Sequence, residues 1–344
     1  MEWIIFYKFP VSNGVRQGAV SSPLFFSIYV DKLIKMLRIS GIGGSIGGLY
    51  VGIIVYADEI FLLSASREGL QSMVNICEDF AWKHNLKFST NPDEEKSKTK
   101  CMIFSKNIRD RLQVAPIMLN GTPLPWVEKL KHLGNILQND NSMENDVALK
   151  RGKFIGKIHS LNQDLHFCSP HLLIKLYIIY CCSFYGSNLY DLFSAKLEKF
   201  YSSWNIAVKI VFKLPHATHK YLIEGISSSL HPKVMMSSRF INYIKQCMHS
   251  SKQAVCFLAH LTHADMRTHV GRNILGISRD CCTSFEDLTS QKVKSSMRYA
   301  PVPEDEEWRV SLIRELLAAS LENEVYVPLS SQEIEDILNY ACIT

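Results

Sequence analysis

Two adjacent carboxylates, Asp58 and Glu59, lie between two apolar runs in the stretch VGIIVYADEIFLLS, residues 51–64. Carboxylate oxygens are the ligands that a hard divalent cation prefers. The same pair is also what the exposed tip of a hairpin carries when it does no chemistry. From these two residues alone a solvated turn is the simpler interpretation, so the elements around them must decide.

Those elements predict a β-hairpin between helices. The β-branched run 49–56 and the run 60–63 flank the carboxylates and are typical of two strands joined by a tight turn. Apolar residues recur at helical spacing over 24–40, after Ser-Pro, and again over 67–85. The segment GIGGSIGG, residues 41–48, follows a helix and opens a strand. A phosphate-binding loop instead follows a strand and opens a helix, so a loop that ends the helix before the strand is the better interpretation.

The rest of the chain predicts an α+β protein that becomes mainly helical. Short strands are expected at 86–88 and 101–105, and a further pair at 117–119 and 133–137. Beyond about residue 143 the apolar pattern is helical to the end, including two short amphipathic helices within 304–344. Segregation of strands and helices along the chain is typical of the α+β class.

A second motif lies upstream of the carboxylates and narrows the interpretation. GVRQGAVSSPLFF, residues 14–26, is followed by a helix and then by YADE. Together they resemble reverse transcriptases of non-LTR (LINE-type) retrotransposons, where the patterns run GxxQGxxxSP and [YF]ADD. The resemblance continues in the same order along the chain through SKTKCMIFSK (97–106), LKHLGNIL (130–137), YCCSFYGSNLYDL (180–192), KLPHATHKYL (213–222) and GRN (271–273).

The resemblance implies an architecture, a reaction and its partners. The expected regions are a partial palm (1–110), a primer-grip-like connection (111–142), a helical thumb-like region (143–215) and a helical carboxyl-terminal region (216–344). The implied reaction is RNA-templated synthesis of DNA on a primer, with Mg²⁺ at the transferring phosphoryl group. An RNA template and a DNA primer are therefore the implied partners.

The resemblance also implies roles for individual residues. Asp58 and Glu59 stand where the catalytic metal ligands belong, and Tyr56 would support the primer terminus. The other implied nucleic-acid and nucleotide contacts are Gly14, Arg16, Gln17 and Gly18 in the loop, Lys98 near the pyrophosphate, and His132 and Gly134 on the primer strand.

Two departures from the family pattern predict impaired catalysis. Glu59 replaces an aspartate, and its extra methylene displaces a carboxylate in a site that is sensitive to about 1 Å. The family's other metal aspartate precedes the GxxQG loop by tens of residues, whereas the thirteen residues before Gly14 contain none. We therefore expect a truncated or decayed carboxyl-terminal part of a retroelement polyprotein that is inactive as this chain alone. A non-enzymatic nucleic-acid-binding remnant and a relic without function remain alternatives.

Composition places the chain among ordinary globular proteins, with 47% apolar residues and a formal charge of +5. Ten cysteines without a CxxC pair favour a reduced intracellular setting, nuclear or cytoplasmic. We expect no signal peptide and no membrane segment, because the best candidate, 172–185, is too short for a bilayer and contains Lys175. Missing palm strands would expose a sheet edge, so self-association is expected.

Three further clusters have ordinary explanations. Cys256, His260, His263 and His269 match no standard zinc spacing and are expected to be helix and loop residues. The aromatic residues between 177 and 190 are expected in the core rather than on a base-stacking platform. The basic residues are a solvated face or a track for duplex phosphates, and both interpretations stay open. They are Lys129, Lys131, Lys150, Arg151, Lys153 and Lys157.

Overall fold

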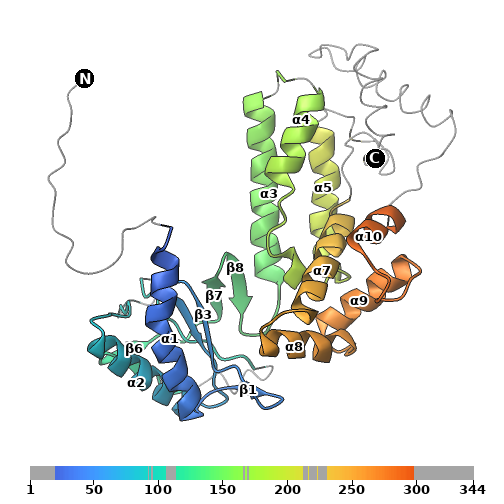
Figure 1. Cartoon of the computed structure of the whole chain (residues 1–344). Helices are drawn as coiled ribbons and strands as arrows, with labels where there is room; N and C mark the ends of the chain where they lie inside the picture. The colour runs from blue at the N-terminus through green and yellow to red at the C-terminus, as the bar shows by residue number, and fades with distance from the viewer. Residues whose placement is uncertain are drawn as a thin grey trace, which may run out of the picture. The chain divides into compact units, whose positions relative to one another are not determined.

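The computed structural model describes most of residues 20–297 (Figure 1). The exceptions within that range are residues 92, 94, 95, 106–113, 166, 169, 212–215, 217–222 and 224–230. The contacts divide the chain into two compact units, 1–128 and 129–344, and each is described by itself. The four-region division predicted from sequence stays a prediction, and the expected helices within 304–344 lie outside the described residues.

The amino-terminal unit packs two helices against short antiparallel strand pairs. Its described elements are α1 (Ser22–Ser40), β1 (Ser45–Ile46), β2 (Leu49–Tyr50), β3 (Ile53–Tyr56), β4 (Glu59–Leu62), α2 (Arg67–Lys83), β5 (Ile117–Leu119) and β6 (Thr122–Leu124). Consecutive strands pair as β1 with β2, β3 with β4 and β5 with β6. The predicted α+β class is confirmed at this level, as are the helices expected at 24–40 and 67–85.

Local sequence explains where the two helices begin and end. Pro23 occupies the first turn of α1, where its missing N–H costs nothing, and Gly41 ends the helix with a left-handed backbone, φ 66°. The Ser66 hydroxyl caps α2 by accepting a hydrogen bond of 3.0 Å from the Gly69 N–H. Both helices therefore have defined ends close to the central hairpin.

The core of this unit lies between the two helices and the central hairpin. Its fully buried members are Val30, Leu33, Leu37, Met73, Cys77 and Phe80, and the hairpin residues packed on it are Ile53, Val55, Ile60 and Leu62. A smaller cluster of Val74, Cys101, Ile117, Leu119 and Leu124 lies under β5 and β6. The helices thus support one face of the hairpin that carries the carboxylates.

Three strand predictions differ from the structure. Residues 86–88 form no strand, and 101–105 contribute only one parallel bridge, from Cys101 to Trp126. Cys101 is buried by packing without a ladder, and apolar pattern alone does not separate these two kinds of burial. Residues 117–119 do not pair with 133–137, since the Asn120-Gly121 turn, with φ 50° and 70°, folds β5 back onto β6.

The carboxyl-terminal unit begins with a hairpin and continues as a helical assembly. Its described elements are β7 (Lys129–His132), β8 (Asn135–Gln138), α3 (Glu144–Leu165), α4 (Pro170–Leu176), a π-helical turn (Tyr177–Cys181), two 3₁₀ turns (Ser187–Leu189 and Ala195–Leu197), α5 (Glu198–Val211), α7 (Pro232–Met248), α8 (Gln253–His263), α9 (His269–Asp280) and α10 (Ser290–Ser296). Helices α3, α4 and α5 run alongside one another in Figure 1. The predicted helical character after residue 143 is confirmed for the described residues.

One continuous apolar core joins these helices. It extends from Val147 on α3 to Met297 after α10, with Tyr177 and Trp204 among its largest buried side chains. The expectation of a core role for the aromatic residues at 177–190 is confirmed for Tyr177, Phe184 and Tyr190. It is wrong for Tyr180 and Tyr185, which are exposed. Among the described residues, no helix is long and apolar enough to cross a bilayer.

Candidate functional site

Asp58 lies in a two-residue turn at the tip of the β3–β4 hairpin. Tyr56 pairs with Glu59 across the hairpin, and Ile53 pairs with Leu62 at its other end. Glu59 is thus the first residue of β4 rather than part of the turn. Ala57 takes a positive φ of 50°, which a non-glycine residue rarely adopts outside a tight turn. The turn predicted between the apolar runs is confirmed.

The two faces of this hairpin have different environments. Val55 and Ile60, the second pair from the tip, pack on the apolar core, whereas Tyr56 remains 64% exposed. Directly opposed residues share a face in an antiparallel pair, so Glu59 lies beside Tyr56 on the outer face. The apolar face fixes the strands while the carboxylates and the phenol reach solvent.

Backbone hydrogen bonds join the glycine-rich segment to the same hairpin. The Gly44 N–H donates to the Leu63 carbonyl at 2.8 Å, and the Leu63 N–H donates to the Gly52 carbonyl at 2.8 Å. A Cβ at Gly52 would overlap the Tyr50 ring, so a larger residue there would require that ring to move. The segment 41–48, which contains β1, therefore supports the hairpin and does not open a helix.

The carboxylate pair satisfies only part of a two-metal site. Asp58 and Glu59 are both exposed and offer oxygen ligands of the kind that Mg²⁺ takes. No group of three or more His, Cys, Asp or Glu side chains among the described residues is arranged to hold a metal ion. The described residues therefore do not fit a complete two-metal centre, and no chemical step through a metal is derived from them.

Other residues predicted for this site lie apart from the tip or outside the described residues. Gly14, Arg16, Gln17 and Gly18 all fall within residues 1–19, which the structure does not describe. Lys98 is exposed and lies in a bend. The roles given to all five residues stay predictions.

The landmark LKHLGNIL, residues 130–137, lies in a second hairpin, formed by β7 and β8. His132 pairs with Asn135, and the two residues between them form the turn. Leu133 and Gly134 both have positive φ, 45° and 77°, as a two-residue hairpin turn with matching twist requires. The Leu133 side chain is 36% exposed at this tip. His132 and Gly134 belong to the carboxyl-terminal unit and Asp58 to the amino-terminal one.

Comparison with known families decides the origin of these hairpins. Residues 1–137 match the family described as reverse transcriptase (RNA-dependent DNA polymerase). The amino-terminal part of the chain is thus similar to reverse transcriptases. The resemblance inferred from GVRQG and YADE is therefore confirmed, and the matched residues reach from before the first motif to the middle of β8.

The chain is also similar to two Pol polyproteins of R2 retrotransposable elements. The Pol polyprotein of the type-2 element R2DM from Drosophila melanogaster is 33% identical over 73 residues, which are 21% of this chain and 7% of the relative. The Pol polyprotein of a type-1 element R2 from Nasonia vitripennis is 38% identical over 64 residues, 19% of this chain and 6% of the relative. The matched segments thus span less than a tenth of either relative.

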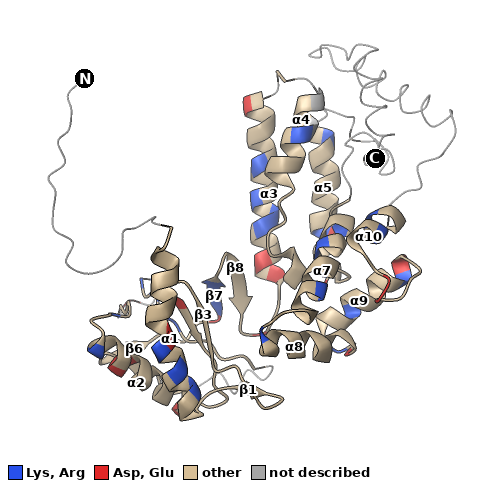
Figure 2. Cartoon of the chain, in the orientation of Figure 1, with Lys and Arg blue, Asp and Glu red and all other residues tan. Residues whose placement is uncertain are grey.

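The basic residues near the second hairpin do not form a uniform solvated face. Lys and Arg positions recur along the α3 ribbon in Figure 2. Lys150 is largely buried beside Asp146, Arg151 donates to the Ser203 hydroxyl at 2.6 Å, and Lys157 donates to the Tyr180 carbonyl at 2.9 Å. At least these three have structural roles, so the α3 track offers fewer cations to a phosphate backbone than the sequence suggested.

Sequence reasoning missed the residues that hold the second hairpin in place. Asp146 and Tyr190 meet behind it, and Asn273 on α9 binds the backbone on either side of Asp191. The motifs YCCSFYGSNLYDL and GRN contained two of these three residues and were noted as landmarks. Their mutual contact was not expected, because no spacing in the sequence links positions about 80 residues apart.

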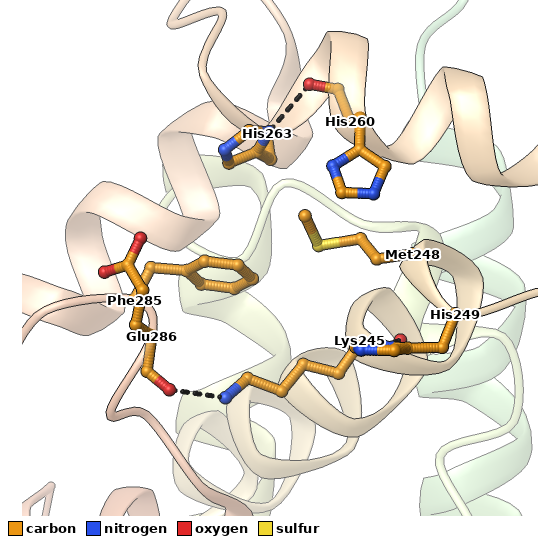
Figure 3. A pocket seen from close by; sticks show the side chains of 7 residues that line it. All are labelled: Lys245, Met248, His249, His260, His263, Phe285 and Glu286. Carbon is orange, nitrogen blue, oxygen red and sulfur yellow. Dashed lines mark hydrogen bonds between the residues drawn. The ribbon is translucent and has the colours of Figure 1, made fainter.

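A separate pocket lies between α7, α8 and the loop before α10 (Figure 3). Its volume is about 410 Å³, and its lining consists of Lys245, Met248, His249, His260, His263, Phe285 and Glu286. The Lys245 ammonium donates to the Glu286 carbonyl at 3.0 Å, and the His263 Nδ1 lies 2.7 Å from the His260 carbonyl. His260 and His263 both lie on α8.

Proposed function

We propose that this chain serves RNA-templated DNA synthesis by holding a primer and its template, and that it does not extend the primer as this chain alone. The observation that carries the proposal is the location of both exposed hairpin tips within the reverse transcriptase match. One tip offers Asp58, Glu59 and Tyr56 to a primer terminus. The other offers Leu133 and Gly134, next to His132, to the primer strand.

The limit on catalysis follows from the ligands at the first tip. Reverse transcriptases generally use Mg²⁺, and transfer of a nucleotidyl group with two metals needs carboxylates that bridge them. Asp58 and Glu59 make up two carboxylates on one hairpin, and the described residues supply no third one beside them. A carboxylate from another segment or another chain would be required for turnover.

Primer binding depends on different groups from catalysis. An apolar side chain and backbone groups at the Leu133-Gly134 turn suit the sugar and base edges of a primer strand. The exposed phenol of Tyr56 suits stacking on a terminal base. These contacts need no metal, so the chain can retain an RNA/DNA duplex while it fails to extend it.

Primer extension and duplex binding together test this proposal. The purified chain would be mixed with an RNA template, an annealed fluorescent DNA primer, deoxynucleotides and Mg²⁺. We expect no extension, but duplex binding whose logarithm falls with the logarithm of salt by roughly 0.7 to 0.9 per phosphate contacted. Tyr56→Ala should weaken duplex binding, because it removes the exposed phenol from the first tip.

Three outcomes would contradict the proposal in different ways. Extension that Asp58→Ala abolishes would show a complete polymerase. Binding without dependence on the residues of either tip would favour a nucleic-acid-binding remnant that uses another surface. No binding even at low salt would favour a relic without function.

A further inference from the structure

The turn of the β7–β8 hairpin has a conformation that its own sequence does not favour. Leu133 takes a positive φ of 45°, a region that a bulky side chain with a Cβ adopts only at a cost. Such a conformation persists when the surroundings hold it in place. The neighbouring contacts therefore show what maintains this turn.

Tyr185 and Gly186 contact the turn directly. The Tyr185 hydroxyl donates to the Leu133 carbonyl at 3.0 Å, and a Cβ at Gly134 would lie 3.2 Å from the Tyr185 ring. Gly186 has a φ of 78°, and a Cβ there would collide with the side chains of Asn135 and Lys150. Residues 185–186 therefore pack closely against the hairpin: Tyr185 contacts Gly134, and Gly186 lies against the side chains of Asn135 and Lys150.

Asp146, at the start of α3, joins the hairpin to the helical core. Asp146 is buried, with only 3% of its surface exposed. Its Oδ1 accepts from the Ile136 N–H at 2.9 Å, and its Oδ2 accepts from the Tyr190 hydroxyl at 2.6 Å and from the Lys150 ammonium at 2.8 Å. Lys150 also donates to the Asn135 Oδ1 at 2.5 Å. One carboxylate therefore links β8, α3 and the segment before α5.

The segment that carries Tyr190 is itself held from α9. Asn273 is fully buried, its Nδ2 donates to the Tyr190 carbonyl at 2.7 Å and its Oδ1 accepts from the Leu192 N–H at 2.8 Å. Arg272 pairs with Asp191 at 2.7 Å. A continuous set of buried polar contacts thus runs from α9 to the hairpin, between residues about 140 positions apart in the chain.

We infer that Asn273, Tyr190, Asp146 and Lys150 are positioning residues that hold the Leu133-Gly134 turn in the conformation that receives the primer. The inference rests on the proposed function for the part concerning the primer. The helices that follow the reverse transcriptase match therefore have a role in the inference. They support the β7–β8 hairpin, within which the match ends, at residue 137.

Tyr190→Phe tests the inference because it removes one hydroxyl and keeps the ring. The matched control is Tyr180→Phe, which removes the hydroxyl of a half-exposed tyrosine ten residues earlier. The measurements on both full-length variants are amide hydrogen exchange at residues 133–137, thermal unfolding, and fluorescence anisotropy of a labelled RNA/DNA duplex. Loss of one hydrogen bond to a charged partner predicts exchange at the turn and a duplex Kd that both rise by about fivefold or more. The control should leave both unchanged.

The outcomes separate the inference from the proposed function. Unchanged exchange at 133–137 in Tyr190→Phe, with the fold intact, would overturn the positioning role. Leu133→Asn introduces a residue that tolerates positive φ and removes the apolar side chain from the tip. If Leu133→Asn leaves duplex affinity unchanged, the hairpin does not hold the primer and the proposed function fails. Faster exchange in Tyr190→Phe would still support the positioning of the turn in that case.

Discussion

The two hairpins that carry the candidate residues are held by opposite kinds of interaction. The β3–β4 hairpin rests through Val55 and Ile60 on an apolar core, and its polar tip is exposed. The β7–β8 hairpin is joined through Ile136 to a buried carboxylate, and its tip carries the apolar Leu133. Apolar packing tolerates small displacements, whereas a buried polar cluster requires each partner to be in place. The second hairpin should therefore be the more sensitive of the two to a single substitution.

Among the substitutions that test this comparison, Asp146→Ala should have the largest effect on stability. It leaves the Tyr190 hydroxyl, the Lys150 ammonium and the Ile136 N–H without their shared buried partner. Removal of one member of a buried ion pair costs about 3–5 kcal/mol. We expect a loss of about 4 kcal/mol in the free energy of unfolding of the carboxyl-terminal unit, measured by native-state hydrogen exchange.

A matched substitution on the surface controls for this result. Asp31 forms an exposed i,i+4 ion pair with Lys35 at 2.6 Å, so Asp31→Ala should cost less than about 0.5 kcal/mol. A cost for Asp146→Ala as small as that of the surface control would show that the polar cluster does not support the hairpin.

Leu37→Ala tests the apolar support of the first hairpin. Leu37 is fully buried in the core on which β3 and β4 pack. A cavity there should destabilise the amino-terminal unit by about 3 kcal/mol, as judged by urea unfolding. Ile39→Ala, at an exposed position two residues away on α1, is the control and should change stability by less than about 0.5 kcal/mol. Equal effects of the two variants would contradict the assignment of the core.

Alkaline titration should give a smaller effect in each unit. Burial raises the pKa of Cys77 from 9.0 to about 12, and burial with the bond to Asp146 raises the pKa of Tyr190 above its ordinary 10.0. Both groups keep their protons in the folded state while the unfolded chain releases them. Stability is therefore complete below these ordinary values and falls as pH rises through them, by up to about 1.4 kcal/mol per pH unit for each group.

Removal of either group identifies its share of the pH dependence. Cys77→Ala should reduce the slope of unfolding free energy between pH 9 and 11 in the amino-terminal unit. Tyr190→Phe should reduce it above pH 10 in the carboxyl-terminal unit. A slope that survives both substitutions would mean that other groups govern the alkaline loss.

Local sequence predicted the helices and strands of the site better than the contacts that hold them in place. Helix α1 follows from apolar period and the Ser22-Pro23 start, and α2 follows from apolar period alone; the bounds of both agree with the structure within a few residues. The run 49–56, expected as one strand, is divided into β2 and β3, and it is β3 that pairs with β4. The segment around Leu133-Gly134 was singled out only through its resemblance to a family motif, and residues 133–137 were expected to form a strand that does not include a turn. Apolar pattern failed at 86–88 and 101–105, where packing buries the chain without a strand partner.

The support of the second hairpin could not be predicted, because it depends on contacts between distant positions. Asp146 in the first turn of α3 reads as an ordinary acidic residue at a helix start, and its partners lie 10 and 44 positions away. Asn273 was noticed within GRN, yet its bonds to the 190–192 backbone appear only once the helices are packed. Side-chain chemistry was visible in the sequence, but the pairing of its members was not.

Each unit contains buried thiols whose reaction with an alkylating reagent can report local unfolding of that unit. Cys77 and Cys101 lie in the amino-terminal unit, with pKa values raised by burial to about 12 and about 11, and Cys181 in the carboxyl-terminal unit is raised to about 11. Only a thiolate reacts with an alkylating reagent at an appreciable rate, so each of these side chains is protected both by its protonation and by its cover. Exposed Cys282 has no such cover. The order in which these cysteines become alkylated therefore records which unit opens first, without any probe being added to the chain.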